Sequence, residues 1–420
     1  MERQGKRDLT SGTTSHAGRF PDMAAGYRPS SRARSHCSRL TWLSFIVAIC
    51  SLPGTVLAQP MTMPEMGQLA ETTEQPTAPV RRLQGSSRQL GYRLASVPKM
   101  FGDVGVAPAL LVGDRQEPVF QATVPLSLGL GRSKISENNN PLPTNRVFFM
   151  YNHFHNALSV TRFDGSTAKS HFDQYTFGIE KLIFNDTASI EVRMPFNSSF
   201  DFQQDSDFIS GGNVGNLSLI YKQLLYWEDT FAIAAGSSFE FPTASDIEGQ
   251  IFGGTTPLEI QNEAVRFLPF VGIVSAPGDE FFWQFTAQVD LGSSGNPVVI
   301  NQVEQGRFND QNLLYLDFSL GHWLLKDEED LLIHSVATLV ELHYVHTMQD
   351  ADRVVIESGP SGTGELFGPV NRFDLLNLAA GLNLIIGPVT NLRVAAVAPL
   401  RGANDRLFDS EFQVQLNRWY

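Results

Sequence analysis

The sequence predicts an all-β fold, namely a closed antiparallel transmembrane β-barrel of twelve strands with an N-terminal partial plug. Three observations predict it: apolar and polar residues alternate from residue 145 onward, long and short connections alternate between these stretches, and the last ten residues alternate up to an aromatic C-terminus. Only a β-strand sorts its residues onto two faces with a period of two. The chain of 420 residues is 42% hydrophobic but has no repeated apolar run long enough for membrane helices. Its net charge of −13 argues against nucleic acid as a partner.

Residues 1–58 are predicted to be a secretory signal peptide. An arginine-rich stretch precedes an apolar run at 40–50, and small residues at 56–58 mark a cleavage site. The apolar run is too short to span a bilayer as a helix. Cleavage removes both cysteines, Cys37 and Cys50, so we expect an exported protein that does not depend on disulfides. A lipid anchor on Cys50 is the alternative, disfavoured by the bulky residue before it.

Residues 59–93 are predicted to be a flexible linker, because they are rich in Pro, Gln, Thr and Ser without periodicity. Residues 94–144 are predicted to be a plug or a periplasmic segment. Within them, 119–131 alternates like a strand, but Pro125 argues against a central position in a sheet. One added strand would make the count odd, whereas bacterial single-chain barrels have even counts. The alternative is a fourteen-stranded barrel.

Residues 145–420 are predicted to form the barrel. In the stretch 281–291, for example, Phe281, Trp283 and Phe285 share one face, and Gln284 and Thr286 share the other. The twelve predicted strands are 145–157, 171–184, 188–199, 213–227, 230–243, 264–277, 281–292, 311–325, 333–348, 373–387, 389–400 and 409–420.

The connections after the odd-numbered predicted strands are long, and those after the even-numbered ones are tight. Outer-membrane barrels have short periplasmic turns and long outward loops. We therefore expect an outer-membrane location, with membrane lipid as a partner. The alternating final strand, 411–420, resembles the signal that such barrels present to the barrel-assembly machinery, which is the second expected partner.

Two segments resemble a known family. The first is Gly212-Asn-Val-Gly-Asn-Leu-Ser-Leu with the later Phe239-Glu-Phe-Pro-Thr243, and it resembles the outer-membrane transporters assigned to the meta-pathway of phenol degradation. Here Asn216 replaces the usual Asp and Ala244 the usual Gly. The second, 134–149, resembles a segment of exported barrel-like proteins of planctomycetes. The resemblance implies a barrel that transports small, aromatic or hydrophobic compounds, and it assigns no site residues.

The alternation also predicts which charged residues face the lumen. These candidates are Glu180, Glu191, Arg193, Lys222, Glu240, Arg266, Asp290, Asp317, Glu341 and Arg393. Rings of charge set the ion preference of a pore. Alternatively, these charges pair across a filled lumen and stiffen the barrel. The expected function is a channel or transporter for small solutes, and the alternative is a structural or adhesive barrel without transport activity.

No cofactor, metal or catalytic residue is predicted. His153 and His155 share a strand face, but the sequence shows no third or fourth metal ligand. A lipase-like pairing of Ser335 with His322 or His334 lacks a nucleophile motif. We therefore expect a protein that is not an enzyme.

Overall fold

The structure is a computed structural model that describes residues 90–103, 110–113, 120–123, 132–161, 167–204, 206–326, 332–357, 363–367, 372–402 and 405–420. The predicted signal peptide and residues 59–89 of the predicted linker lie outside these ranges. Within them the chain is nearly all strand, with one short helix, α2 (Tyr92–Ser96). No helix in the described ranges is long and apolar enough to cross a membrane.

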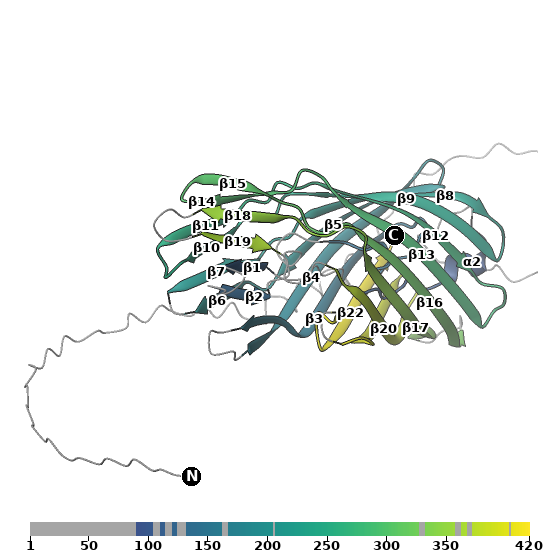
Figure 1. Ribbon diagram of the computed structural model, residues 1–420. Helices are drawn as coiled ribbons and strands as arrows, with labels where there is room; N and C mark the ends of the chain where they lie inside the picture. Colours follow the sequence, from purple (N-terminus) through teal and green to yellow (C-terminus); the bar gives the residue numbers. More distant parts are fainter. Residues whose placement is uncertain are drawn as a thin grey trace, which may run out of the picture. The chain divides into compact units, whose positions relative to one another are not determined.

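Twelve long strands form a closed antiparallel barrel (Figure 1). They are β3 (Arg146–Thr161), β4 (Thr167–Ile183), β5 (Ala188–Asn197), β8 (Leu217–Trp227), β9 (Phe231–Phe241), β12 (Arg266–Ser275), β13 (Phe281–Gly292), β16 (Leu313–Lys326), β17 (Ile333–Thr347), β20 (Asp374–Ile386), β21 (Thr390–Pro399) and β22 (Ser410–Trp419). Each pairs with the next, and β22 pairs with β3, which closes the wall. The prediction of twelve strands is confirmed, and the fourteen-strand alternative is wrong.

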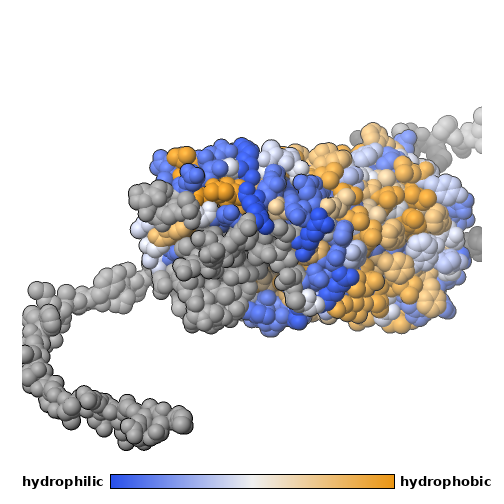
Figure 2. All heavy atoms as spheres, viewed as in Figure 1, coloured by the Kyte–Doolittle hydropathy of each residue, from blue (hydrophilic) through white to orange (hydrophobic). Residues whose placement is uncertain are grey.

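The two faces of the wall differ in polarity, with apolar side chains on one face and polar side chains on the other, as the alternation predicts. On β17, Val340 and Leu342 face outward and are 50% and 40% exposed, whereas Glu341 and His343 face inward and are 1% and 0% exposed. A water-soluble protein shows the opposite preference. Figure 2 shows the outer face as an orange band over the barrel strands, with blue residues beside it. The wall is therefore apolar outside and polar inside.

At one end, here called the turn end, the wall strands are joined by the described residues 184–187, 228–230, 276–280 and 387–389. At the other end, called the hairpin end, short hairpins extend the barrel (Figure 1). One six-stranded sheet contains β6 (Phe200–Gln204), β7 (Asp207–Gly211), β10 (Ile247–Ile251), β11 (Thr256–Ile260), β14 (Asn296–Ile300) and β15 (Val303–Phe308). The sequence predicts loops for these segments. The structure corrects this, since strands of five or six residues are too short for their period to stand out.

Four further short strands continue the wall sheet at the hairpin end: β1 (Leu110–Gly113), β2 (Phe120–Thr123), β18 (Arg353–Glu357) and β19 (Thr363–Phe367). Strand β2 pairs with residues 159–161 of β3, beyond the part of β3 that pairs with β22. The sequence predicts that all of 94–144 lies in or beneath the lumen. Residues 120–123 instead join the hairpin layer.

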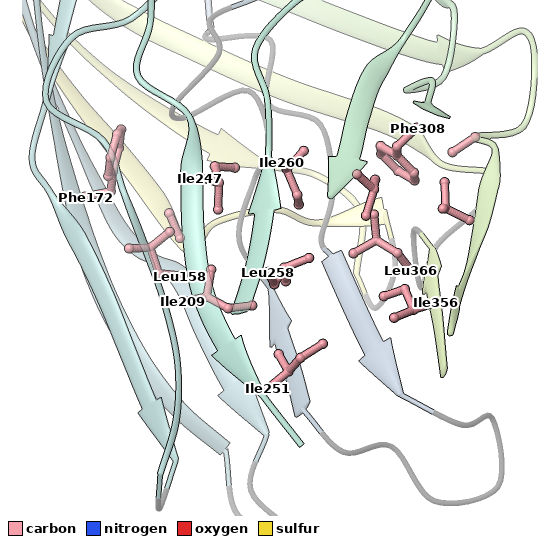
Figure 3. Packing of buried hydrophobic residues seen from close by; sticks show 14 of the residues in the cluster. Leu158, Phe172, Ile209, Ile247, Ile251, Leu258, Ile260, Phe308, Ile356 and Leu366 are labelled. Carbon is pink, nitrogen blue, oxygen red and sulfur yellow. The ribbon is translucent and has the colours of Figure 1, made fainter. Parts of the chain in front are cut away.

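The hairpin layer has an apolar core of its own (Figure 3). Ile209, Ile247, Leu258 and Ile260 from the six-stranded sheet are 0–2% exposed and belong to one cluster with Phe172 of the wall. Burial of such side chains stabilises by roughly 1.5–3 kcal/mol each. The polarity of the interior thus changes from charged within the wall to apolar in the hairpin layer.

Two stretches, 97–103 and 132–144, run through the interior of the wall, and we call them together the lumen segment. They lie antiparallel, since Met100 N–H donates to Asn139 O at 2.7 Å and Asn138 N–H donates to Phe101 O at 3.1 Å. Their hydrogen bonds reach side chains on β4, β5, β8, β13, β17, β20, β21 and β22. Contacts with strands on all sides of a closed wall place these residues in the lumen.

Candidate functional site: the filled lumen

All ten charged residues that the alternation predicts for the lumen are buried side chains of wall strands. They are Glu180 on β4, Glu191 and Arg193 on β5, Lys222 on β8, Glu240 on β9, Arg266 on β12, Asp290 on β13, Asp317 on β16, Glu341 on β17 and Arg393 on β21, each 0–6% exposed. Because water does not reach them, the lumen at their level is filled rather than open in this conformation.

The largest group of buried charges, here called the five-charge cluster, adds Arg146 of β3 to four of the ten and joins β3, β4, β5 and β8. Glu180 and Glu191 lie directly opposite each other in register, and like charges so placed repel. Arg146 bridges them, with Nε 2.9 Å from Glu180 Oε2 and Nη2 2.9 Å from Glu191 Oε2. Lys222 Nζ lies 2.8 Å from Glu180 Oε1, and Arg193 Nε lies 2.5 Å from Glu191 Oε1. Three cations thus pair with two buried carboxylates. The cations come from three different strands, so the cluster forms only when the wall is assembled.

A lysine of the lumen segment occupies a second acidic group. Lys134 Nζ lies 2.8 Å from Asp317 Oδ1 and also contacts Asp103. His343 Nδ1 lies 2.8 Å from the same Asp317 oxygen. Asp103, Asp317 and His343 bring their ligand atoms within 4.8 Å of one another, which suits a metal ion. The ammonium of Lys134 contacts both carboxylates, so a cation already neutralises this group.

Glu341 holds the backbone of the lumen segment. Its carboxylate accepts hydrogen bonds from Phe101 N–H at 2.9 Å and Gly102 N–H at 3.0 Å. It also accepts from Ser319 Oγ at 3.1 Å and lies 3.1 Å from His343 Nε2. Hydrogen bonds to a charged acceptor contribute more than those between neutral groups. Glu341 is therefore a principal anchor of this segment.

Arg393 makes a further attachment, from β21. Its Nη1 donates to Met100 O at 3.0 Å and to Gln415 Oε1 at 2.7 Å. Its guanidinium also lies over the ring of Phe101, 4.2 Å from the centroid, at a distance that favours a cation–π interaction. The phenylalanine of the lumen segment is thereby fixed against the wall.

Toward the hairpin end, Asp290 gathers two arginines. Arg266 Nε lies 2.6 Å and Arg132 Nη1 3.4 Å from its carboxylate, and Tyr315 donates to it at 3.2 Å. Glu240 accepts a hydrogen bond from Ser133 N–H. All ten predicted residues are thus accounted for, and most of them contact one another or the lumen segment.

Some interior charges come from residues that the alternation does not identify. Arg146 is the first residue of β3, and Asp103, Arg132 and Lys134 belong to the lumen segment, which has no period. Only the excess of predicted carboxylates over predicted cations hinted that further positive charge was needed. The position of that charge depends on how the lumen segment threads the barrel.

The turn end is closed by apolar packing. Leu94 of α2 and Leu142 of the lumen segment cluster with Phe282, Trp323 and Ile385 of the wall. A cavity of about 30 Å³ remains beside them, lined in part by Lys99 and Trp419, and it has room for about two water molecules. The interior therefore has an apolar stopper at the turn end, a charged middle and an apolar core at the hairpin end.

Gly102 sits where a side chain does not fit, which gives the first testable prediction. Its φ is +76°, and an added Cβ would lie 2.6 Å from Glu137 Cα. We expect Gly102→Ala to lower the free energy of unfolding by about 1–3 kcal/mol and to loosen the lumen segment, as measured by thermal melting in micelles. Gly253→Ala is the matched control, because Gly253 has φ +73° but nothing within 4 Å. Equal losses in both variants would contradict the predicted steric role of Gly102.

The wall and its two faces define the class: a closed twelve-stranded antiparallel β-barrel with an apolar outer face and a filled polar lumen. No protein-family model matches the chain, and no curated protein matches it. Solved structures that resemble it include an outer membrane channel from Pseudomonas putida F1, at 10% identity and TM-score 0.43 over 65% of this chain and 94% of that one. The toluene transporter TodX of Pseudomonas putida has 10% identity and TM-score 0.35 over 76% and 96%. The NanC porin has 9% identity and TM-score 0.38 over 66% and 99%. The likeness is one of barrel architecture.

Proposed function

We propose that this protein is an outer-membrane channel for small solutes that the lumen segment holds closed, and that it is not an enzyme. The observation that carries the proposal is that a separate stretch of chain fills the barrel, attached by hydrogen bonds and ion pairs to the wall. Such a stretch is removable in a way that a lumen filled by wall side chains alone is not. Passage then requires the lumen segment to move.

The outer face supports the membrane location. A closed wall has no unpaired strand edge, which is the condition for a sheet to exist in hydrocarbon. The outward side chains Phe318, Leu320, Val340 and Leu342 are 40–50% exposed, a poor arrangement in water and a good one in lipid. By the rule for outer-membrane barrels, the turn end faces the periplasm and the hairpin end faces outward. The barrel-assembly machinery is the partner proposed for β22.

A charge placed on this face gives the second prediction. We expect Val340→Lys to lower the free energy of unfolding in lipid vesicles by about 2–4 kcal/mol, the cost of a lysine near the bilayer midplane. Val355→Lys is the control, because Val355 on β18 is 54% exposed but lies in the hairpin layer. Urea titration of both variants in vesicles measures the difference. Equal stability of the two would place Val340 outside the lipid.

The polarity of the lumen supports a movable segment. If the segment shifts, the charges that it covers can be hydrated, whereas an apolar core would lose its packing. The ten wall charges then line the vacated space and are proposed to set the preference among solutes. The resemblance noted above adds small aromatic compounds such as phenol to the solutes worth testing.

The test is conductance in planar bilayers together with solute uptake. We expect brief, infrequent conductance steps from the full chain. We also expect cells that lack the protein to grow more slowly on phenol or to take phenol up more slowly. A folded barrel that stays silent under all voltages and without its lumen segment would favour the structural or adhesive function instead. The specific observation behind that second candidate is the hairpin layer, whose packed core makes it a rigid outward surface.

A further inference from the structure

We propose that the outer face of the barrel carries a divalent transition-metal site formed by His153, His155 and His171. The sequence shows the first two on one strand face, and the structure supplies the third. The side chains offer ring nitrogens that all lie within 4.8 Å of one another. The site is independent of whether the lumen opens.

The site is built where β3 and β4 pair near the hairpin end. His153 lies opposite Asp173 in register, and the pairing then shifts between Phe154 and Leu158. This bulge leaves three residues of β3 facing His171, and it includes Asn156 with φ 55°. Bulges commonly re-aim side chains at functional places. Here the bulge brings the rings of His155 and His171 to 4.5 Å and those of His153 and His171 to 5.5 Å.

A carboxylate orients one ligand from behind. Asp173 Oδ1 lies 2.7 Å from Nδ1 of His153, which leaves Nε2 of that ring to bind a metal. A carboxylate behind a ligating histidine fixes the ring and raises its basicity in metal sites. His171 Nδ1 accepts a hydrogen bond of 3.3 Å from Asn156 N–H, and a metal that binds this ring replaces that weak contact.

The chemistry selects a class of metal. Three neutral imidazoles suit Zn²⁺, Cu²⁺ and Ni²⁺, and not Mg²⁺ or Ca²⁺. A tetrahedral zinc ion at about 2.0–2.1 Å from each nitrogen needs those nitrogens roughly 3.4 Å apart, with water in the fourth position. His155 and His171 are exposed and His153 is partly so. Their rings are therefore able to rotate until the nitrogens reach this separation.

The level of the site makes it reachable from solution. Along the same outer face, Phe149 pairs with Phe177, then Tyr151 with Tyr175, and the histidines follow. Tyrosines mark the border of the lipid-facing band in such barrels. Asp409 lies next to the site, where its N–H donates to His155 O at 2.8 Å and its carboxylate accepts from Asn156 Nδ2 at 2.6 Å. These two contacts hold the bulge that carries His155.

The experiment titrates the untagged full chain in detergent micelles with Zn²⁺ against a coloured chelator. We expect one Zn²⁺ per chain and a melting temperature that rises with Zn²⁺, because the ion would join β3 to β4. His171→Ala is expected to weaken binding by more than about 100-fold, and Asp173→Asn by about 10-fold, which is the usual range for an orienting group. Co²⁺ in place of Zn²⁺ is expected to give the visible absorption of a tetrahedral site.

His346→Ala is the matched control. His346 lies on β17 beside Asp374 and Tyr344, so it repeats the histidine–carboxylate pair without the two companion histidines. We expect it to leave Zn²⁺ binding unchanged. Absence of stoichiometric Zn²⁺ binding in the unmodified chain, or equal losses in the His346 and His171 variants, overturns the proposal.

Discussion

Removal of residues 90–144 is expected to turn a barrel that is mostly silent in planar bilayers into one with long-lived, discrete conductance steps. The deletion takes away α2, the whole lumen segment and the short strands β1 and β2, and with them the apolar stopper and the cover of the five-charge cluster. Strand β3 begins at Arg146, after the deletion, so all twelve wall strands remain. Water then hydrates the exposed wall charges, and a twelve-stranded wall is left to conduct through its own bore.

Two controls keep this result interpretable. Deletion of residues 59–89, which lie outside the described ranges, leaves the lumen segment in place and is expected to leave conductance unchanged. Circular dichroism and the mobility shift on heating show whether the longer deletion still folds. A folded deletion variant without increased conductance would falsify the proposed role of the lumen segment.

Glu341→Ala is expected to release the lumen segment from the wall. The change leaves Phe101 N–H and Gly102 N–H buried without the carboxylate that accepts them. Each orphaned donor costs about 1–3 kcal/mol, so the closed conformation loses several kcal/mol relative to an open one in which water satisfies both groups. We expect frequent openings in planar bilayers and faster proteolysis near residue 101, with a smaller loss of whole-barrel stability.

Glu411→Ala provides the comparison. Glu411 is a lumen-facing carboxylate of β22 that is 2% exposed, and it accepts a hydrogen bond from Gln413 of its own strand. Its removal takes away a buried carboxyl group without taking an acceptor from Phe101 or Gly102. Channel openings are therefore expected to stay rare in this variant. If the two variants open alike, loss of any lumen carboxyl group loosens the segment and Glu341 is not its specific anchor.

The wall could be predicted because its signal is local. Residues 281–291 carry enough alternation to fix the element and its two faces, and the predicted 281–292 coincides with β13 (Phe281–Gly292). The ten lumen charges follow from the same rule, since side chains two residues apart share a face of a strand. The short hairpin strands gave no such signal, because five residues such as those of β10 hold only two full repeats of the pattern.

The sequence by itself thus determined the number of wall strands, the polarity of each wall face and the identity of ten of the buried ionisable residues. Tertiary structure decided which of these charges meet. It placed Lys134 between Asp103 and Asp317, it set Arg146 across Glu180 and Glu191, and it brought His171 to the two histidines of β3. The reason is physical: alternation along a strand is fixed by the backbone, whereas contacts across a lumen or a bulge depend on register, closure and the path of a segment that has no period.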